Sequence, residues 1–411
     1  MTATDQSAGQ HEYVPGTSIP VVAFDPSAGT YRSAGDSMAM YDRLREQCPA
    51  GARSSAGPRG FWVLTKCAPQ REAYQMPAVF SNSAPGWYDP EPSYAWIPEM
   101  LDPPEHTKWR QLLSPFFSPK RVGEMEESVR ARCAALVDAL ADKGACDYVA
   151  DFAQKYPTAI FLDIMGVPAD NLDQFMRWED DILHTPLSPQ GLEVTTKAMN
   201  DVVEMFKEVI ADRRRHPGED LVSESLTWRI DGDPIPDDDL LAMCLLMFMA
   251  GLDTVTNMLA YSTWHLATHH DDRRRIVEDP ETIPPAIEEF LRYYAIVTPG
   301  RKVLSDIDFH GCPMRQGDMV YMPLAAATRD PDAFERADEV LIDRKINNHI
   351  AFGAGPHRCL GSHLARREMK IALEEWHRAI PNYEMVPGSD APEYIGMQIG
   401  MKSLSLVWKP K

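Results

Sequence analysis

The chain has 411 residues, of which 44% are hydrophobic and 25% are charged. Its 61 acidic and 41 basic residues give a formal net charge of −20, which argues against nonspecific binding to nucleic acid or to an anionic membrane surface. The seven cysteines are an odd number without a C-x-x-C pair, so no disulfide framework, structural zinc site or iron–sulfur cluster is indicated. We expect an acidic, soluble protein of a reducing compartment, with the cytoplasm as its default location.

The first twenty residues contain few apolar side chains, and we expect residues 1–20 to form a flexible N-terminal arm. They show neither a signal peptide nor a membrane anchor. The longest apolar run, residues 240–252, has 13 residues and is too short to span a bilayer. No linker or repeat divides the chain, so residues 1–411 are interpreted as one domain, large enough to enclose a cofactor and a substrate.

Helical periodicity fills the middle of the chain, and strand-like segments lie near its ends. The first predicted element is a strand over residues 61–64. Helices follow over residues 121–142, 150–165, 168–184, 192–215, 237–270 and 284–294. Strands over 301–309 and 319–323 precede a helix over 361–379, and a strand over 404–408 ends the pattern. The chain is therefore predicted to be mainly α, with a small β-sheet region.

The predicted helix over residues 237–270 is apolar on all sides between residues 240 and 249, so it must be buried. Gly251 weakens its middle, and the hydroxyl of Thr254 can compete for the carbonyl of Ala250, four residues earlier. A local opening or bend is expected there. Asp253 would be buried beside Thr254, which is costly unless each side chain has a partner or a task. A helix kinked only for packing is the alternative.

One cysteine lies in a glycine-rich turn just before the predicted helix over residues 361–379. Gly355 and Gly361 allow backbone conformations closed to bulkier residues and a close approach to a flat ligand. The free N–H groups at the helix start point toward the Cys359 sulfur and favour its thiolate. This pattern favours a thiolate held against a metal.

Two other interpretations of Cys359 remain. It could be a buried structural thiol, which is the usual state of an arbitrary cysteine. It could also be a nucleophile with His357 or His363 as its base, as in cysteine hydrolases. The second alternative leaves Phe352 and both glycines of the turn without a role.

Three motifs in this chain resemble those of the cytochrome P450 family. Residues 352–361 match F-x-x-G-x-x-x-C-x-G in full, residues 250–254 resemble A-G-x-[DE]-T, and residues 289–292 resemble E-x-x-R. The resemblance implies the cytochrome P450 fold, a large single-domain triangular helical prism with a small β-sheet region. It also implies haem b (iron protoporphyrin IX) between two helices, with Cys359 as the axial thiolate ligand and Phe352 and Gly361 beside it.

The resemblance also implies roles for the other two motifs. Thr254 would hydrogen-bond the dioxygen activated at the haem, and Asp253 would belong to the relay that supplies protons. Cleavage of the O–O bond needs two protons delivered in order while bulk water is excluded, and the thiolate assists from the other face. Glu289 and Arg292, one helical turn apart, resemble two members of a structural triad whose third member would be Arg344. Taken alone, they would be read as an ordinary surface ion pair.

Two further residue sets follow from the resemblance. Cationic groups placed to hold the haem propionates are His106, Arg110, Arg301 and His357; arginine forks match carboxylates well. Over nearly its whole length the chain is similar to the bacterial camphor hydroxylase group, in which residues 93–98, with Tyr94 and Trp96, would contact substrate. Tyr94 would donate a hydrogen bond to a single oxygen atom of an apolar substrate. The apolar walls would come from Leu246, Met249, Ala250, Val297 and Met397.

Two positions depart from the camphor hydroxylase pattern. Met249 is bulkier than the valine expected there, and Pro299 replaces an aspartate. A compact, oxygenated bicyclic monoterpenoid such as 1,8-cineole therefore fits about as well as camphor. The reaction implied is hydroxylation of an unactivated C–H bond with O2.

Electrons must come from another protein, because the chain has no flavin- or nicotinamide-binding motif. The resemblance implies a [2Fe–2S] ferredoxin reduced by a flavoprotein ferredoxin reductase. A local basic patch would have to offset the net charge of −20 against an acidic partner. The candidates are Arg71, Arg110, Lys120, Arg121, Arg358, Arg366 and Arg367. The rival functions are a peroxide-driven haem enzyme, against which Asp253 and Thr254 argue, and a haem- or ligand-binding sensor without turnover.

Overall fold

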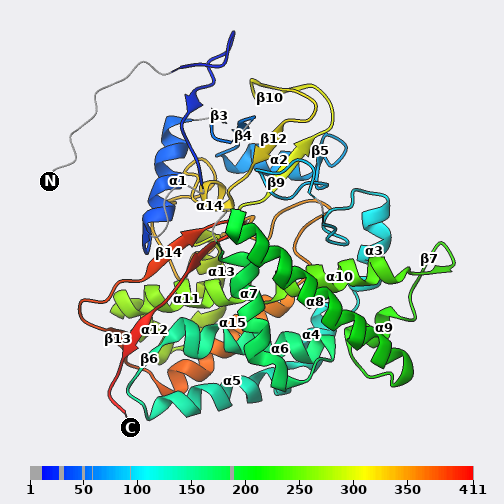
Figure 1. The fold of residues 1–411 in the computed structure, drawn as a ribbon. Coiled ribbons are helices and arrows are strands. Elements are labelled where there is room, and N and C mark those ends of the chain that lie inside the picture. The colour runs from blue at the N-terminus through cyan, green and yellow to red at the C-terminus, as the bar shows by residue number, and fades with distance from the viewer. Residues whose placement is uncertain are drawn as a thin grey trace.

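The structure is a computed structural model that describes residues 12–26, 32–48, 51–57, 59–92, 94–185 and 189–410. Helices dominate it (Figure 1). The α-helices are α1 (Asp36–Gln47), α2 (Cys67–Tyr74), α3 (Glu105–Leu113), α4 (Pro119–Glu124), α5 (Glu126–Ala141), α6 (Lys155–Met165), α7 (Leu172–Leu183), α8 (Pro189–Arg215), α9 (Leu221–Ser225), α10 (Asp237–Gly251), α11 (Asp253–Thr268), α12 (His270–Glu278), α13 (Ile283–Tyr293), α14 (Leu324–Thr328) and α15 (Ser362–Ala379). Shorter turns are the π-helix η1 (Val149–Ala153) and the 3-10 helices η2 (Ala169–Asn171) and η3 (Pro280–Thr282).

The strands form small sheets, of which the largest and the β10–β11 pair lie beside α1, α2 and α14 at the top of Figure 1. Their bounds are β1 (Val21–Val22), β2 (Arg32–Ser33), β3 (Ala52–Ser54), β4 (Phe61–Val63), β5 (Phe80–Ser81), β6 (Ala145–Asp147), β7 (Arg229–Ile230), β8 (Asp233–Pro234), β9 (Gly300–Val303), β10 (Ile307–Phe309), β11 (Cys312–Met314), β12 (Met319–Tyr321), β13 (Glu384–Met385), β14 (Pro392–Ile395), β15 (Ile399–Met401) and β16 (Ser405–Val407). The largest sheet has the order β1-β3-β4-β12-β9-β5. Within it β1–β3 and β4–β12 are parallel, and the other pairs are antiparallel.

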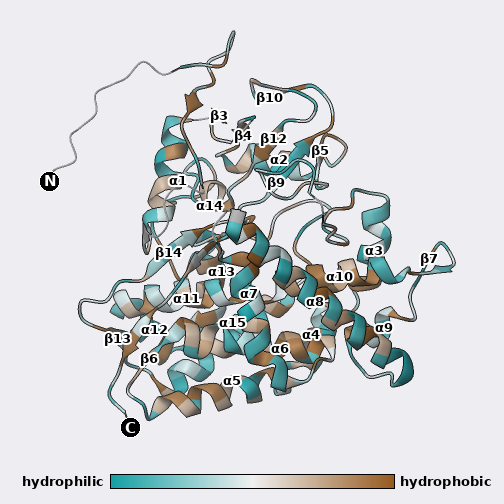
Figure 2. Cartoon of the chain, viewed as in Figure 1, coloured by the Kyte–Doolittle hydropathy of each residue, from teal (hydrophilic) through white to brown (hydrophobic). Residues whose placement is uncertain are grey.

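Helices α10 and α11 run through the middle of the helical part, where α11 packs against α6, α13 and α15. Helix α8 packs on α7 and α10, and α5 packs on α15. Figure 2 shows α10 as mostly hydrophobic, whereas α5, at the edge of the molecule, alternates between hydrophobic and hydrophilic residues. This difference follows from burial, because α10 is covered on all sides and α5 on one. The core therefore lies around the α10–α11 segment.

The long helix predicted over residues 237–270 is interrupted as expected. Helix α10 ends at Gly251 and α11 begins at Asp253. The Thr254 hydroxyl donates to the carbonyl of Ala250 at 3.1 Å, which confirms the predicted competition for that carbonyl. A Cβ atom at Gly251 would lie 2.9 Å from the Phe161 ring, so a glycine there lets α6 pack closely.

The segment Asp237–Thr268, which comprises α10 and α11, is long and apolar enough to cross a membrane by length and composition. Of its most apolar stretch, 67% is buried inside the protein. The segment therefore forms part of the protein core.

Several predicted elements are subdivided in the structure. The helix expected over residues 121–142 breaks at Met125 into α4 and α5, and those expected over 150–165 and 168–184 begin with η1 and η2. The strand expected over 301–309 divides into β9 and β10. The helices without a sequence prediction are α1, α2, α3, α9, α12 and α14. Most of these are short, so tertiary packing rather than their own periodicity stabilises them.

The expected N-terminal arm lies only partly within the described residues. Residues 1–11 fall outside them. Residues 12–20 form a turn closed by a bridge between Tyr13 and Pro20, and Ile19 is buried. Strand β1 follows directly and pairs with β3.

Candidate active site

The loop before α15 holds Cys359 by backbone contacts. The Cys359 N–H donates to the carbonyl of Phe352 at 2.8 Å. Gly355 has a φ of +68°, and a Cβ atom there would lie 2.2 Å from the carbonyl oxygen of Tyr74, so only glycine fits. Gly361 differs from the expectation, because its φ of −77° is open to any residue. A Cβ atom at Gly361 would meet no protein atom within 4 Å, so this position borders unfilled space.

Cys359 is exposed, whereas the other six cysteines are buried or half-buried. Protein nevertheless surrounds the sulfur closely, and this burial raises the pKa of the thiol against the opposing effects of the Gly361 N–H and Arg110. Neither His357 nor His363 forms a hydrogen bond with Cys359 in the described part of the chain. Such a thiol is a poor nucleophile but would lose its proton to a bound metal ion. The geometry thus argues against the cysteine hydrolase alternative.

The four residues predicted to hold propionates lie together beside this loop. The rings of His106 and His357 are 3.9 Å apart between centroids. Burial, followed by the nearby Arg301, His106 and Arg110, lowers the pKa of His357 to about 2. Burial and Arg110 likewise lower the pKa of His106 to about 4, against the opposing effect of Asp102. Both rings are therefore neutral at pH 7, and Arg110 and Arg301 supply the positive charge of the cluster.

Two ring nitrogens in this cluster are buried without a hydrogen-bond partner among the described residues, Nδ1 of His106 and Nε2 of His357. The Asn82 amide donates to the Glu99 carbonyl at 2.6 Å and lies 3.2 Å from Nδ1 of His357. Nδ1 therefore accepts, and the neutral ring carries its proton on the unpartnered Nε2. A free donor beside two guanidinium groups suits a buried carboxylate. Together with the space at Gly361, the cluster fits a flat ligand with two carboxylates, as haem is.

At the break between α10 and α11, Asp253 is 1% exposed and has three partners. Its carboxylate accepts from Tyr394 Oη at 2.8 Å, from Gln398 Nε2, and from His184 Nε2 at 3.2 Å. The sequence predicted that a buried Asp253 would need partners, but nothing in it indicated these. They lie on other elements, between 69 and 145 residues away along the chain. Thr254 is half-buried, close to the exposed Ala250.

The predicted substrate-contact residues come from three segments that meet α10 or α11. The Ile97 N–H donates to the carbonyl of Ala242 at 3.4 Å and brings residues 94–98 to α10. A bridge joins Val297 to Gln398, whose side chain reaches Asp253 at the start of α11. The remaining positions are Leu246 and Met249, both 9% exposed; the exposed Ala250; and the half-buried Met397.

Tyr94 and Trp96 form the most polar part of this region. Their rings lie 4.6 Å apart, and Nε1 of the buried Trp96 has no partner among the described residues. Burial, followed by Tyr88 and Asp89, raises the pKa of Tyr94, so its hydroxyl stays protonated. That hydroxyl hydrogen-bonds Tyr88, which sequence reasoning did not single out.

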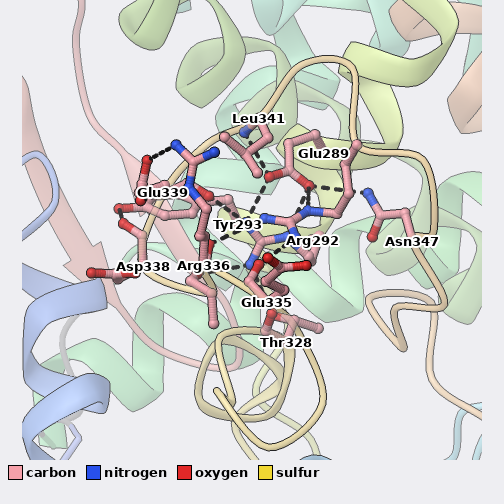
Figure 3. Close-up of polar contacts among 12 residues, drawn as sticks. Glu289, Arg292, Tyr293, Thr328, Glu335, Arg336, Asp338, Glu339, Leu341 and Asn347 are labelled. Carbon is pink, nitrogen blue, oxygen red and sulfur yellow. Dashed lines mark hydrogen bonds and ion pairs between the residues drawn. The ribbon is translucent and has the colours of Figure 1, made fainter.

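Glu289 and Arg292 of the E-x-x-R motif are fully buried and form a network of polar contacts (Figure 3). Arg344, whose side chain is 7% exposed, also binds Glu289. Glu289 accepts from Arg292 at 2.7 and 2.8 Å and from Arg344 at 2.8 Å. It also accepts from the Leu341 N–H and from Asn347. The guanidinium of Arg292 additionally reaches the carbonyls of three residues: Thr328, Ala337 and Glu339. The triad expected from the sequence is therefore in contact, and its charges are satisfied.

The basic side chains considered for partner docking differ in their pairing. Arg121, Arg366 and Arg367 each form an ion pair with a glutamate. The others are Arg71, Arg110, Lys120 and Arg358, none of which forms an ion pair among the described residues. The Arg110 guanidinium donates to the carbonyl of Arg358 at 2.9 Å, so these two lie next to the cysteine loop.

Comparisons with known proteins give a consistent result. A family model described as Cytochrome P450 matches residues 53–407. The chain is 34% identical to "Probable cytochrome P450 127A1" of Sinorhizobium fredii, covering 85% of this chain and 84% of that protein. It is 32% identical to "Steroid C26-monooxygenase" of Mycobacterium tuberculosis, covering 82% and 92%. The crystal structure of CYP101J2 matches with a TM-score of 0.84 at 30% identity, covering 95% of this chain and 97% of that chain.

Fold and family together define a mainly α haem-thiolate monooxygenase. The chain belongs to the cytochrome P450 family. The predicted family, fold class, enzyme class and cofactor, a haem with an axial cysteine thiolate, are thereby confirmed. The alternative of a sensor without turnover is set aside.

Proposed function

We propose that this cytochrome P450 hydroxylates an unactivated C–H bond of a small, oxygenated monoterpenoid of the camphor or 1,8-cineole type. The balanced reaction is R–H + O2 + 2 electrons + 2 protons → R–OH + H2O. A [2Fe–2S] ferredoxin, reduced by a flavoprotein reductase, supplies the electrons. We place the reaction in the cytoplasm, which the burial of the α10–α11 segment supports.

In this proposal Cys359 would bind the haem iron through its thiolate, and the cluster of His106, Arg110, Arg301 and His357 would hold the propionates. Haem supplies the site that binds O2 and oxidises the substrate. Arg110 and Arg301 would bind carboxylates through their guanidinium groups, and His357 would donate from its unpartnered Nε2. Phe352 would stay fixed beside the cofactor, because its carbonyl holds Cys359 and Arg366 lies 4.5 Å over its ring.

Asp253 and Thr254 are proposed to bring the two protons to the reacting oxygen. The interruption of the helix leaves the Thr254 side chain half-buried beside the exposed Ala250, and Asp253 lies one residue earlier in the core. A hydroxyl and a carboxylate at adjacent positions can pass a proton while the surrounding core excludes bulk water. A peroxide-driven reaction would not need this pair.

The substrate class rests mainly on the pairing of hydrogen-bond donors with apolar walls. Nε1 of Trp96 has no hydrogen-bond partner among the described residues, and the neighbouring Tyr94 hydroxyl donates to Tyr88, an acceptor that a substrate oxygen would replace. The other side chains proposed to line this region, such as Leu246 and Met249, are apolar. A buried donor without a partner is unfavourable, so an oxygen atom of the substrate is expected to occupy it. One oxygen on a compact hydrocarbon body matches this pattern.

The electron donor is proposed from charge. Arg71, Lys120 and Arg358 form no ion pair with a carboxylate among the described residues and so remain available to an acidic protein despite the net charge of −20. Arg110 and Arg358 flank the cysteine loop, where electrons would enter. Association should therefore weaken as salt is raised.

A ligand-exchange experiment tests the assignment of Cys359. In Cys359→His the ferrous carbon monoxide adduct should lose the thiolate-type Soret band, because imidazole replaces sulfur. The half-buried Cys146→Ser is the matched control and should keep the band. An unchanged band in Cys359→His would mean that another residue holds the iron.

A ligand screen tests the substrate class. Oxygenated monoterpenoids should produce the high-spin spectral shift with micromolar affinity, and a steroid should bind at least tenfold more weakly. Tyr94→Phe should weaken the binding of camphor or 1,8-cineole about fivefold, since one hydrogen bond is worth about 1 kcal/mol. Tyr88→Phe is the complementary variant: it removes the acceptor of the Tyr94 hydroxyl and should leave binding unchanged or make it tighter. Tighter binding of a steroid, as the name of the mycobacterial relative suggests, would overturn the proposed substrate.

A further inference from the structure

Asp253 is connected toward the protein surface by a histidine that no sequence motif indicated. Nε2 of His184 lies 3.2 Å from the Asp253 carboxylate, and Nδ1 lies 2.8 Å from the carboxylate of Asp180. The side chains become steadily more accessible along this line, from 1% at Asp253 to 9% at His184 and 61% at Asp180. His184 follows the C-terminal end of α7, so the line joins that helix to the start of α11.

The charges around His184 hold it in its protonated form. Burial lowers its pKa, but Asp253 and Asp180 raise it more, and the net pKa is about 9. Lys402, which binds Asp180 at 3.1 Å, opposes this effect. The ring of Tyr394 packs 4.4 Å from the imidazole and adds no charge at neutral pH. An imidazolium between two carboxylates can release a proton to one of them, and the neutral ring can then be reprotonated at the nitrogen left bare.

Glu179 is a third carboxyl group in this cluster. It is fully buried, and neither of its carboxyl oxygens has a well-formed hydrogen bond among the described residues. The nearby Gln154 amide slightly favours the charged form of Glu179. Burial, followed by the charge of Asp253, raises the pKa of Glu179 well above its usual value. This shift favours the neutral form of Glu179, and no hydrogen bond among the described residues links it to the surface. The continuous line of hydrogen bonds runs through His184 instead.

We propose that protons pass from solvent to Asp253 through Asp180 and His184, so that His184 refills the group that supplies the reaction. The inference rests on the proposed role of Asp253. In the transfer, Nε2 of His184 gives its proton to the Asp253 carboxylate, and the neutral ring keeps the proton on Nδ1. After Asp253 passes its proton on, a half-turn of the imidazole brings the bare Nε2 to Asp180, where it takes a proton delivered from solvent and becomes an imidazolium again. Two passages supply the two protons consumed per product.

The first experiment measures the titration of His184 in the holoenzyme, in its diamagnetic ferrous carbon monoxide form. With isotope-labelled histidine, the 12 histidines can be followed by NMR. His184 should titrate near pH 9, about one unit or more lower in Asp253→Asn, and higher in Lys402→Gln. Asp272→Asn changes the partner of His265 and is the matched control. A His184 pKa unaffected by Asp253→Asn would overturn the proposal, whatever the substrate of the enzyme is.

The second experiment separates proton transfer from a purely structural ion pair. His184→Gln removes the charge, and His184→Arg keeps the charge but cannot release a proton at working pH. With a substrate that gives the spin shift, both variants should form product about tenfold more slowly with an altered solvent isotope effect. The wild-type rate should fall as pH rises through about 9, when His184 loses its proton, and this fall should be absent in both variants. Full activity and an unchanged pH profile in His184→Arg would show that His184 only holds Asp253 in place.

Failure of this inference is distinguishable from failure of the proposed substrate. If monoterpenoids do not bind but another ligand gives the spin shift, the rates can be measured with that ligand. If monoterpenoids are hydroxylated and His184→Gln is fully active, the substrate proposal stands and the relay is wrong.

Discussion

Two buried ionic networks in this molecule differ in how completely their charges are satisfied. Around Glu289 and Arg292 the side chains are 0% exposed, and every contact ends on a donor or acceptor within the protein. Around Asp253 the network contains the unsatisfied Glu179 and continues through His184 to the exposed Asp180. The first arrangement suits a part that stays fixed, and the second suits groups that exchange protons. Burial of charge alone therefore does not indicate function, whereas an open connection to solvent does.

The largest effect is expected from breaking the closed network. Glu289→Gln leaves Arg292 and part of Arg344 as buried, uncompensated charge, and loss of one partner in such a pair costs about 3–5 kcal/mol. We expect little folded protein with haem, measured as haem per chain and as the thermal unfolding midpoint. Glu339→Gln is the control, because its ion pair with Arg336 is exposed and should change stability little. Normal haem content in Glu289→Gln would contradict a structural role for the network.

A smaller effect, on coupling rather than on folding, is expected at the interruption of the helix. Thr254→Ala should continue to oxidise NADH but release most of the oxygen as peroxide, with about tenfold less product per NADH, since the hydroxyl that directs protons is lost. Product and peroxide are measured in the same reaction. Thr268→Ala removes a similar back-bonded hydroxyl at the other end of α11 and should leave the ratio unchanged. An unaltered ratio in Thr254→Ala would remove this residue from the mechanism.

The two networks also differ in how far the sequence predicts them. Glu289 and Arg292 lie one turn apart on one helix, and the family resemblance added Arg344, so three members of the closed network were expected. Its other partners were not expected, and they are Thr328, Ala337, Glu339, Leu341 and Asn347. The break at Gly251 and the hydroxyl bond of Thr254 were predicted from local spacing, because both depend on neighbours within one turn.

The partners of Asp253 could not be predicted in the same way. His184, Tyr394 and Gln398 come from the end of α7 and from the β14–β15 region, and only the folded chain brings them to α11. The unpartnered Nε2 of His357 could not be predicted either, because its protonation depends on the contact between Asn82 and the other ring nitrogen. A single sequence shows that Asp253 needs partners but not which residues provide them.

The smallest effect is expected beside the closed network, where Glu288 faces outward and binds Arg366 and His349. Burial raises the pKa of Glu288, but these partners lower it more, to about 2. A carboxyl group with a lowered pKa stabilises the fold above its unfolded value near 4.5, and this contribution disappears as pH falls through about 2. Because the pair is about one-third exposed, we expect Glu288→Gln to cost about 1 kcal/mol at pH 7.

The same substitution has an opposite expected effect on partner binding. Glu288→Gln frees Arg366 close to the cysteine loop, so an acidic ferredoxin should bind more tightly while the fold becomes less stable. The stability difference between wild type and variant, measured by urea unfolding, should shrink from pH 7 toward pH 3. Glu374→Gln provides a control for charge removal alone, because Glu374 lies farther along α15 and pairs with Arg130 of α5. Equal ferredoxin affinities in wild type and Glu288→Gln would place the docking patch away from Arg366, because removing a neighbouring negative charge must strengthen any site that includes it.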